Sequence, residues 1–255
     1  MSYAKYQNWK ISPLTGEPYL SVVVPARDVE KQILITIDRI ASYMSSLGYP
    51  WELIVCDLGS KDKTASKVKD LHYSNLTLIQ GMAGKTNQTI QQGMLAARGR
   101  FVLFEDFQDS TPVEEVSRLL PKVAREGYDL AVGCRVAAQH AVSSGLPAER
   151  WIRSGTQWIL KQLFKVQVND PACSFRLYSR RAAQRLFKAL TLNGASLHVE
   201  SIYLASRFGY RIAEVPVGWV KTSKQNSHVF KRFRRVLPDL IKSRWNDLNG
   251  KYKEA

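Results

Sequence analysis

The first half of the chain alternates short apolar runs with longer segments in which apolar residues recur at helical spacing. The short runs are rich in β-branched residues and stop at proline, glycine or acidic residues, as buried strands do. Strands are expected at 20–24, 51–56, 76–79, 101–105 and 128–132, and helices at 30–47, 62–71 and 86–98. Strands alternating with helices of this length predict βαβ units, and therefore an α/β fold with a mostly parallel sheet flanked by helices.

The second half of the chain has mainly helical patterns. Helices are expected at 156–165, 180–190 and 197–208, and one further strand at 212–217. Pro216 lies within that strand and suits an edge position, because proline cannot donate a ladder hydrogen bond. Without an internal repeat or a glycine-rich linker, the pattern predicts one domain over 20–220, with an N-terminal arm at 1–19 and a C-terminal segment at 221–255.

The strand expected at 101–105 ends in a group of acidic residues. Glu105, Asp106 and Asp109 follow its apolar positions, and Thr111 with Glu114 then forms the pattern of a helix-capping box. Strand ends of this kind line the ligand crevice of open α/β sheets, where carboxylates can hold a hard cation against a diphosphate. The alternative is that the acids only solvate a loop and favour a helix N-terminus.

The charge of the chain is strongly basic and unevenly distributed. Among 255 residues, 37 Lys and Arg stand against 22 Asp and Glu, which gives a formal net charge of +15. Residues 221–253 hold ten of these cations and two acids, a local balance of 10 − 2 = +8. A localised basic patch indicates a polyanionic neighbour, either an anionic membrane surface or nucleic acid.

Apolar residues spaced by three and four positions run through 228–245, with basic residues between them and a break at Pro238. This pattern predicts a basic amphipathic helical segment that can lie in a membrane interface. The alternative is that its apolar stripe packs on the domain while its charges face water. The N-terminus lacks a signal-peptide pattern, and three widely spaced cysteines are typical of reduced thiols in a cytoplasmic protein.

Several motifs in a fixed order resemble those of family-2 glycosyltransferases with the GT-A fold, in particular the dolichyl-phosphate β-glucosyltransferases and polyprenyl-phosphate mannose synthases. The resemblance extends from about Leu20 to Tyr252. The matching segments are Ser21-Val-Val-Val-Pro-Ala, 52–64 with its Asp-Leu-Gly-Ser-Lys-Asp-Lys-Thr end, Gly84-Lys85, 93–104, Asp170-Pro-Ala-Cys-Ser-Phe-Arg-Leu-Tyr, Val199-Glu200, 209–217 and 244–248.

The resemblance implies an enzyme that moves a sugar, with inversion, from a nucleotide-sugar donor to a polyprenyl (dolichyl-type) phosphate. The donor residues that it implies are Pro25, Ala26, Arg27, Asp28, Asp57, Lys85, Glu105 and Asp106. Arg135, Arg153 and Arg176 would bind the acceptor phosphate, since guanidinium suits bidentate phosphate recognition. Asp106 and Arg135 would be the catalytic residues, and Asp106, Gln108 and Asp109 would hold Mg²⁺ or Mn²⁺.

The same resemblance and the basic segment 228–245 predict a cytoplasmic protein attached peripherally to the inner face of a membrane. An anionic membrane surface is the expected partner of 228–245, nucleic acid is not favoured, and a membrane protein or a second copy of the chain would be a further partner.

The chain departs from the family pattern at donor and metal positions. Leu58 and Gln108 stand where the family has acids, Arg27 replaces a tyrosine, and His198 replaces an aspartate. A phosphate acceptor is already anionic near neutral pH, so the chemical demand falls on stabilising the departing nucleoside diphosphate. The lost acids leave a second hypothesis open: a catalytically impaired GT-A protein that serves as a binding or scaffold subunit of a membrane-associated assembly.

Overall fold

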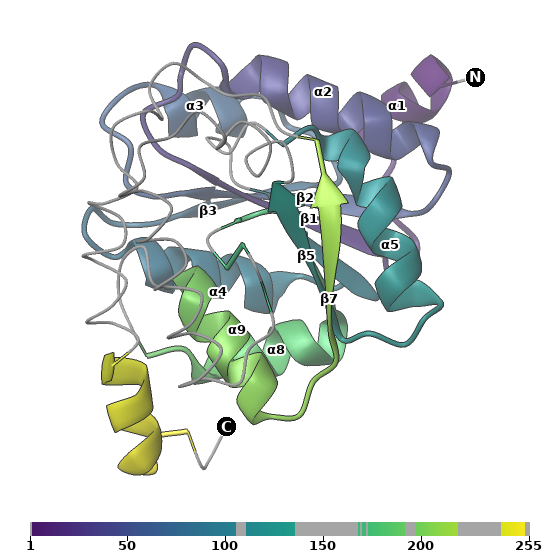
Figure 1. Cartoon of the computed structure of the whole chain (residues 1–255). Coiled ribbons are helices and arrows are strands. Elements are labelled where there is room, and N and C mark those ends of the chain that lie inside the picture. Colours follow the sequence, from purple (N-terminus) through teal and green to yellow (C-terminus); the bar gives the residue numbers. More distant parts are fainter. Residues whose placement is uncertain are drawn as a thin grey trace, which may run out of the picture.

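The protein, analysed as a computed structural model, is described at residues 2–105, 111–135, 168, 170–171, 173–191, 197–218 and 241–252. Its centre is a seven-stranded sheet in the order β3-β2-β1-β4-β6-β5-β7, which lies between two layers of helices (Figure 1). The strands are β1 (Leu20–Ala26), β2 (Trp51–Asp57), β3 (Leu76–Gln80), β4 (Phe101–Phe104), β5 (Leu130–Arg135), β6 (Arg176–Ser179) and β7 (Ile212–Val217).

The parallel part of the sheet has the βαβ organisation that the sequence predicts. Strand β1 pairs in parallel with both β2 and β4, and β2 pairs in parallel with β3. Their carboxyl ends therefore meet at one edge of the sheet, where the crevice of an open α/β sheet forms. The helices are α1 (Ser2–Ile11), α2 (Ile33–Ser46), α3 (Thr64–Lys69), α4 (Thr86–Ala96), the 3-10 turn η1 (Val113–Glu115), α5 (Val116–Ala124), α8 (Arg180–Ala189) and α9 (Leu197–Arg207).

Strand β6 was not predicted from the sequence. It lies antiparallel between β4 and β5, and so joins the first half of the sheet to the second. The strand is only four residues long, and its first residue is Arg176, so it lacks the apolar run that marks the other central strands. Strand β7 pairs with β5 at the end of the sheet, which gives Pro216 the edge position expected for it.

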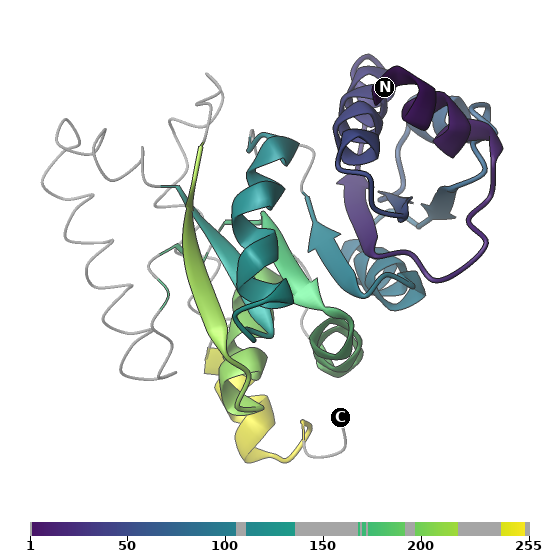
Figure 2. The same cartoon turned by 90° about the vertical axis from the view of Figure 1, so that its right-hand side faces the viewer.

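Each face of the sheet carries its own hydrophobic core, because successive strand residues point to opposite faces. In β1, Val22 and Val24 pack with the layer that contains α1, α2 and α5, whereas Val23 packs with α4, α8 and α9. The two layers cover opposite faces of the sheet (Figures 1 and 2). Within the described residues, no helix is long and apolar enough to cross a bilayer. Cys56, Cys134 and Cys173 are buried free thiols.

Residues 2–11 form a helix, although the sequence suggested only an arm. The indole of Trp9 stacks on that of Trp51 with ring centroids 4.3 Å apart, and its Nε1 donates to the Trp51 carbonyl at 2.9 Å. Asn75 Nδ2 donates to the Trp9 carbonyl at 2.6 Å and to that of Ser12 at 2.8 Å. The N-terminal helix is thus fixed to the domain by aromatic stacking and buried amide hydrogen bonds.

The capping box expected at Thr111 is wrong. Pro112 has an extended backbone, with φ −60° and ψ 137°, and no side chain caps the turn η1 that follows. Helix α5 begins only at Val116, because the turn of 3-10 helix comes first. The helix expected at 156–165 and residues 228–240 of the amphipathic segment lie outside the described residues, whereas 241–248 are helical.

Candidate functional site

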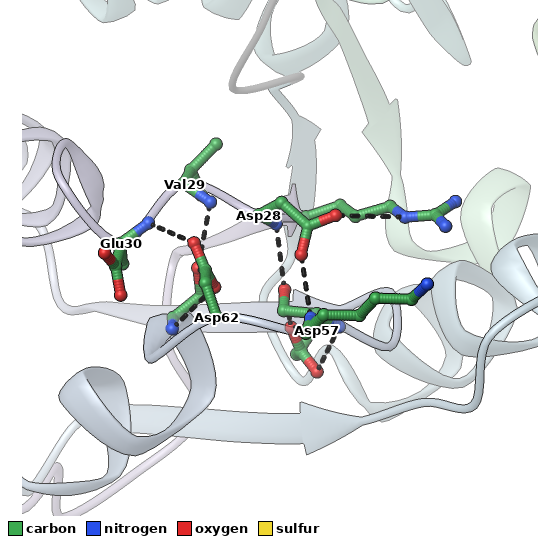
Figure 3. Close-up of polar contacts among 9 residues, drawn as sticks. Asp28, Val29, Glu30, Asp57 and Asp62 are labelled. Carbon is green, nitrogen blue, oxygen red and sulfur yellow. Dashed lines mark hydrogen bonds and ion pairs between the residues drawn. The ribbon is translucent and has the colours of Figure 1, made fainter.

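The loops that follow β1 and β2 are joined at the carboxyl edge of the sheet. Asp28 has a positive φ of 51°, a conformation that non-glycine residues adopt uncommonly. It is held there by its own backbone N–H, which donates to Ser60 Oγ at 3.0 Å, and by Lys61 N–H, which donates to Asp28 Oδ1 at 2.7 Å. These contacts, shown in Figure 3, fix the position of Asp28 over the end of β2.

A second set of hydrogen bonds joins the same loops farther from the sheet. The backbone N–H of Val29 donates to Thr64 Oγ1, and that of Glu30 donates to Asp62 Oδ2, both at 2.9 Å (Figure 3). Partial burial acts to raise the pKa of Asp62, but hydrogen bonds from the Thr64 hydroxyl and from the Glu30 and Thr64 amides outweigh it, so the pKa lies below its ordinary value. The Asp62 carboxylate therefore stays charged as it braces the loop.

A third loop, between β3 and α4, packs against the second. A Cβ atom on Gly59 would lie 2.5 Å from the backbone N of Ala83, and Gly59 has φ +77°, so only glycine fits there. Lys85 is exposed at the start of α4, and its backbone N–H donates a hydrogen bond to the Met82 carbonyl at 3.0 Å. Cations and helix N-termini both attract anions, so this loop brings positive potential to the carboxyl edge of the sheet.

Asp57 is the buried acid at the centre of these loops. It is the last residue of β2, pairs with Ala26 of β1 and is 4% exposed. Its carboxylate accepts hydrogen bonds from the backbone N–H and the hydroxyl of Ser60. Because each carboxylate oxygen has two lone pairs, these bonds orient Asp57 and leave acceptor capacity for a ligand donor such as a base N–H or a ribose hydroxyl.

Glu105 lies outside this group of loops. It follows the last residue of β4 and is buried, and its Oε1 is 3.9 Å from Arg39 Nη2 on α2. Its backbone N–H donates to the Val23 carbonyl at 3.0 Å. The side chain thus faces the α2 layer, and we leave it out of the donor contacts proposed below.

The guanidinium of Arg176 is fully buried, with no exposed surface. Its Nε donates to the Cys173 carbonyl at 2.8 Å, and its Nη2 donates to the Pro171 carbonyl at 2.6 Å. Its Nη1 reaches α9, where it donates to the His198 carbonyl at 2.6 Å and to Ser201 Oγ at 2.9 Å. This side chain ties segment 170–173 to α9, so we assign it a positioning role and not contact with phosphate.

The remaining candidates are only partly visible. Arg135 is the last residue of β5 and pairs with Val217 of β7, which puts its backbone at the same edge of the sheet as Asp57. Asp106, Gln108, Asp109 and Arg153 lie outside the described residues. Within the described ranges, no group of three or more His, Cys, Asp or Glu side chains is arranged to hold a metal ion.

The geometry adds residues that were not named as site residues from the sequence. Ser60, Asp62 and Thr64 hold the β1 and β2 loops together, and Gly59 allows the third loop to approach. The signal was present in the Asp-Leu-Gly-Ser-Lys-Asp-Lys-Thr run itself. Glycine, serine, aspartate and threonine are the residues that form tight, side-chain-bonded turns.

Comparison with known proteins agrees with this architecture. The family model described as glycosyl transferase family 2 matches residues 21–187. The chain is 32% identical over 222 residues to a dolichyl-phosphate beta-glucosyltransferase of Drosophila melanogaster, covering 79% of this chain and 67% of the relative. It is 28% identical over 253 residues to a human protein of the same name, covering 92% of this chain and 77% of the relative.

Solved structures share the fold at lower identity. Mannosyl-3-phosphoglycerate synthase from Rubrobacter xylanophilus superposes with a TM-score of 0.66 at 18% identity, covering 92% of this chain and 75% of that one. Glucosyl-3-phosphoglycerate synthase from Mycobacterium tuberculosis was solved with Mn²⁺, UDP and glucosyl-3-phosphoglycerate. It superposes with a TM-score of 0.62 at 21% identity, covering 89% of this chain and 80% of that one. With the sheet order, the crevice loops and the family match in agreement, the chain belongs to glycosyl transferase family 2 and is a glycosyltransferase of the GT-A fold.

Proposed function

We propose that the protein transfers a sugar from a nucleotide-sugar donor to a polyprenyl phosphate of the dolichyl type, with inversion at the anomeric carbon. The observation that carries the proposal is the likeness over most of the chain to relatives named dolichyl-phosphate beta-glucosyltransferases. The interlocked loops at the carboxyl edge of β1 and β2 support it, because they hold Asp28 and Asp57 in fixed positions at the edge of the sheet where open α/β folds bind their ligands.

On the donor side, we propose that Asp57 and Asp28 accept hydrogen bonds from the base and ribose, and that the backbone of Pro25 and Ala26 at the end of β1 lies against the donor. Arg27 and Lys85 supply positive charge for the diphosphate. Arg27 is about half exposed and its Nε lies 3.7 Å from Asp28 Oδ2, so its guanidinium can leave this weak pair for a phosphate oxygen. The rigid loops lower the entropy lost when the donor binds.

On the acceptor side, Arg135 and Arg153 bind the lipid phosphate. A phosphate oxygen of the acceptor attacks the anomeric carbon, the bond from that carbon to the donor's β-phosphate oxygen breaks, and the nucleoside diphosphate leaves with the bonding electrons. The second pKa of a phosphate monoester is about 6, so the attacking oxygen is already deprotonated near neutral pH. The protein therefore needs positive charge at the leaving group more than it needs a general base.

Asp106, Gln108 and Asp109 are the residues that we propose to hold Mg²⁺ or Mn²⁺. Two carboxylates and an amide oxygen form a hard-oxygen donor set, which suits either cation. When bound, the cation supplies Lewis-acid stabilisation of the developing charge on the nucleoside diphosphate. The solved Mycobacterium tuberculosis synthase that contains Mn²⁺ with UDP supports this use of the fold.

We also propose that the protein works on the cytoplasmic face of a membrane, which it meets through the basic segment 228–245. The lipid acceptor requires contact with a membrane, and the +8 charge of residues 221–253 favours an anionic surface such as the cytoplasmic leaflet. A membrane protein or a second copy of the chain would complete the assembly.

The decisive experiment measures release of nucleoside diphosphate from a panel of nucleotide sugars, with a short-chain polyprenyl phosphate and Mg²⁺ or Mn²⁺ in detergent. Turnover that requires the lipid phosphate is expected, and Asp106→Asn should abolish it. Arg181→Lys is the control, because this exposed arginine on α8 pairs with Asp129 at 3.4 Å and takes no part in the proposed contacts. Silence across the panel, together with no calorimetric binding of UDP or GDP, would instead favour the scaffold hypothesis.

A further inference from the structure

The C-terminal helix 241–248 turns its polar side inward and its apolar side outward. Ser243 and Asn246 are buried, whereas Ile241, Trp245 and Leu248 are 59%, 65% and 75% exposed. Spacings of four and three residues place these three side chains on one face of the helix. A surface helix of a globular protein normally has the opposite arrangement, so this outward face calls for a partner.

The inward polar face is satisfied by a buried cluster of hydrogen bonds. Asn246 Nδ2 donates to Thr191 Oγ1 at 3.1 Å, and Tyr252 OH donates to Glu200 Oε1 at 2.8 Å. Glu200 Oε1 also accepts from the backbone N–H of Thr191 at 2.9 Å. Buried polar groups are tolerated when they are hydrogen-bonded, and the polar groups of this cluster have such partners.

A second group of contacts, from Asp247, also fixes the helix to α9. Asp247 Oδ2 accepts from Tyr203 OH at 2.6 Å and from Arg207 Nε at 3.0 Å. The helix cannot rotate to bury Trp245 without breaking these contacts and the buried cluster around Glu200. The exposure of the apolar face is therefore a property of the folded domain.

The charges around that face are basic. Lys242, Arg244 and Lys251 are exposed in the same segment. The acid of the segment, Asp247, is paired with Arg207, so it adds little negative charge to the outer surface. An exposed apolar face with tryptophan, flanked by lysine and arginine, has the composition of a helix that lies in the headgroup region of an anionic bilayer.

We propose that Ile241, Trp245 and Leu248 form a membrane face that inserts into an anionic bilayer, and that the contacts with α9 and Thr191 hold the catalytic domain in one orientation on it. The proposal rests on the proposed function for the lipid-linked nature of the acceptor. It goes further by assigning the contact to three described residues and by making it rigid. In both views the C-terminal segment and the N-terminus lie at opposite ends of the molecule (Figures 1 and 2), so α1 and α2 would face away from the lipid.

The test measures sedimentation of the full chain with vesicles of phosphatidylcholine and phosphatidylserine. Trp245→Ser should weaken partitioning about tenfold, which corresponds to the loss of one large apolar side chain from the interface. Ile35→Ser is the matched control, since Ile35 is 72% exposed on α2 and should leave partitioning unchanged. Vesicles of phosphatidylcholine alone should bind more weakly than the anionic ones.

The insertion depth of Trp245 is measured by fluorescence quenching with brominated phosphatidylcholine. The wild type should show a quenched tryptophan component that is missing from Trp245→Phe. Equal partitioning of wild type and Trp245→Ser, or equal binding to neutral and anionic vesicles, would overturn the proposal. So would a wild-type dimer that dissociates in Trp245→Ser and shows no vesicle binding, because the face would then bind a second copy.

The rigid attachment is tested by hydrogen exchange of amides 241–252. Asn246→Ala with Tyr252→Phe removes bonds to Thr191 and Glu200, and should speed exchange there both in solution and on vesicles. Unchanged exchange would overturn the rigid attachment. All these measurements use no donor or acceptor, so they can fail while turnover persists, and failure of the turnover assay leaves them standing.

Discussion

Replacing Arg176 separates a positioning role from contact with the acceptor phosphate. The sequence suggests phosphate binding, whereas the structure buries the guanidinium completely and directs it to the carbonyls of Pro171, Cys173 and His198. Arg176→Met keeps a long unbranched side chain but removes every donor. We therefore expect loss of stability first, with loss of activity following the loss of folded protein.

The size of the effect follows from the bonds that would be lost. Without the guanidinium, the carbonyls of Pro171 and Cys173 lose the donors described above, while that of His198 keeps the Ser201 hydroxyl at 2.9 Å. A buried acceptor left unsatisfied costs about 1–3 kcal/mol. The Cys173 carbonyl is buried and that of Pro171 partly buried, so losing both bonds destabilises the fold by about 3 kcal/mol. For a chain of this size that lowers the Tm by about 6–12 °C.

Thermal unfolding followed by circular dichroism measures this shift, with Arg181→Met as the control. Arg181 lies on the same segment, is 77% exposed and pairs with Asp129 at 3.4 Å, so its loss should cost less than about 1 kcal/mol. Arg176→Lys should be intermediate, because one ammonium cannot reach acceptors that the planar guanidinium spans. An unchanged Tm in Arg176→Met, with a raised KM for the lipid phosphate alone, would refute the positioning role.

Three further substitutions test other parts of the fold. Glu52→Ala should lower the free energy of unfolding by about 2 kcal/mol, because the buried carboxylate accepts hydrogen bonds from Arg98 Nη2 and from the Arg98 backbone N–H, both at 2.8 Å. Urea unfolding measures this loss, and a loss near zero would contradict the prediction. Trp9→Ala should lower the free energy of unfolding by about 3–5 kcal/mol and expose α1 to proteolysis, because it removes the ring that stacks on Trp51. A protease-resistant N-terminus in the variant would show that other contacts hold α1. Burial raises the pKa of the Cys56 thiol from 9.0 to about 12, so the folded state holds this proton more tightly than the unfolded chain does. The stability linked to Cys56 is then complete below pH 9 and is lost as pH rises toward about 12. Cys56→Ala should therefore lose less unfolding free energy between pH 9 and about 12 than the wild type, as measured by urea titration at each pH. An equal loss in both proteins would contradict the prediction.

The parallel strands could be predicted because burial on both faces produces a continuous apolar run. Strands β1 and β2 are buried at every position, and their sequence shows it directly. Strand β6 could not be found in this way, since Arg176 is compatible with the core only through carbonyls supplied by other segments. Helix α1 escaped prediction for a related reason, because its apolar partner Trp51 lies 42 residues away in sequence.

The candidate site was predictable where it depends on strand ends and not where it depends on side-chain direction. Asp28 and Asp57 follow or end adjacent parallel strands, so their proximity follows from the topology. Glu105 also follows a strand end, yet alternation from Leu103 directs it to the α2 face and to Arg39. For helix 241–248 the sequence left two alternatives open, an apolar stripe in a membrane interface or one packed on the domain, and the structure leaves Ile241, Trp245 and Leu248 exposed.

At Leu58, where the family pattern has an acid, the proposed donor site lacks a negative charge, and the hydrogen bonds that hold the loop do not involve the Leu58 side chain. The backbone N–H of Leu58 donates to the Ala26 carbonyl at 2.9 Å, which any residue could do, and its side chain packs against the core beneath the loop. The loop geometry comes instead from Asp28 and Asp62, whose hydrogen bonds join it to the β1 loop. Shape and charge are therefore set by different residues. Under the proposed function, the stabilisation of the leaving diphosphate then falls more on fixed cations such as Arg27 and Lys85.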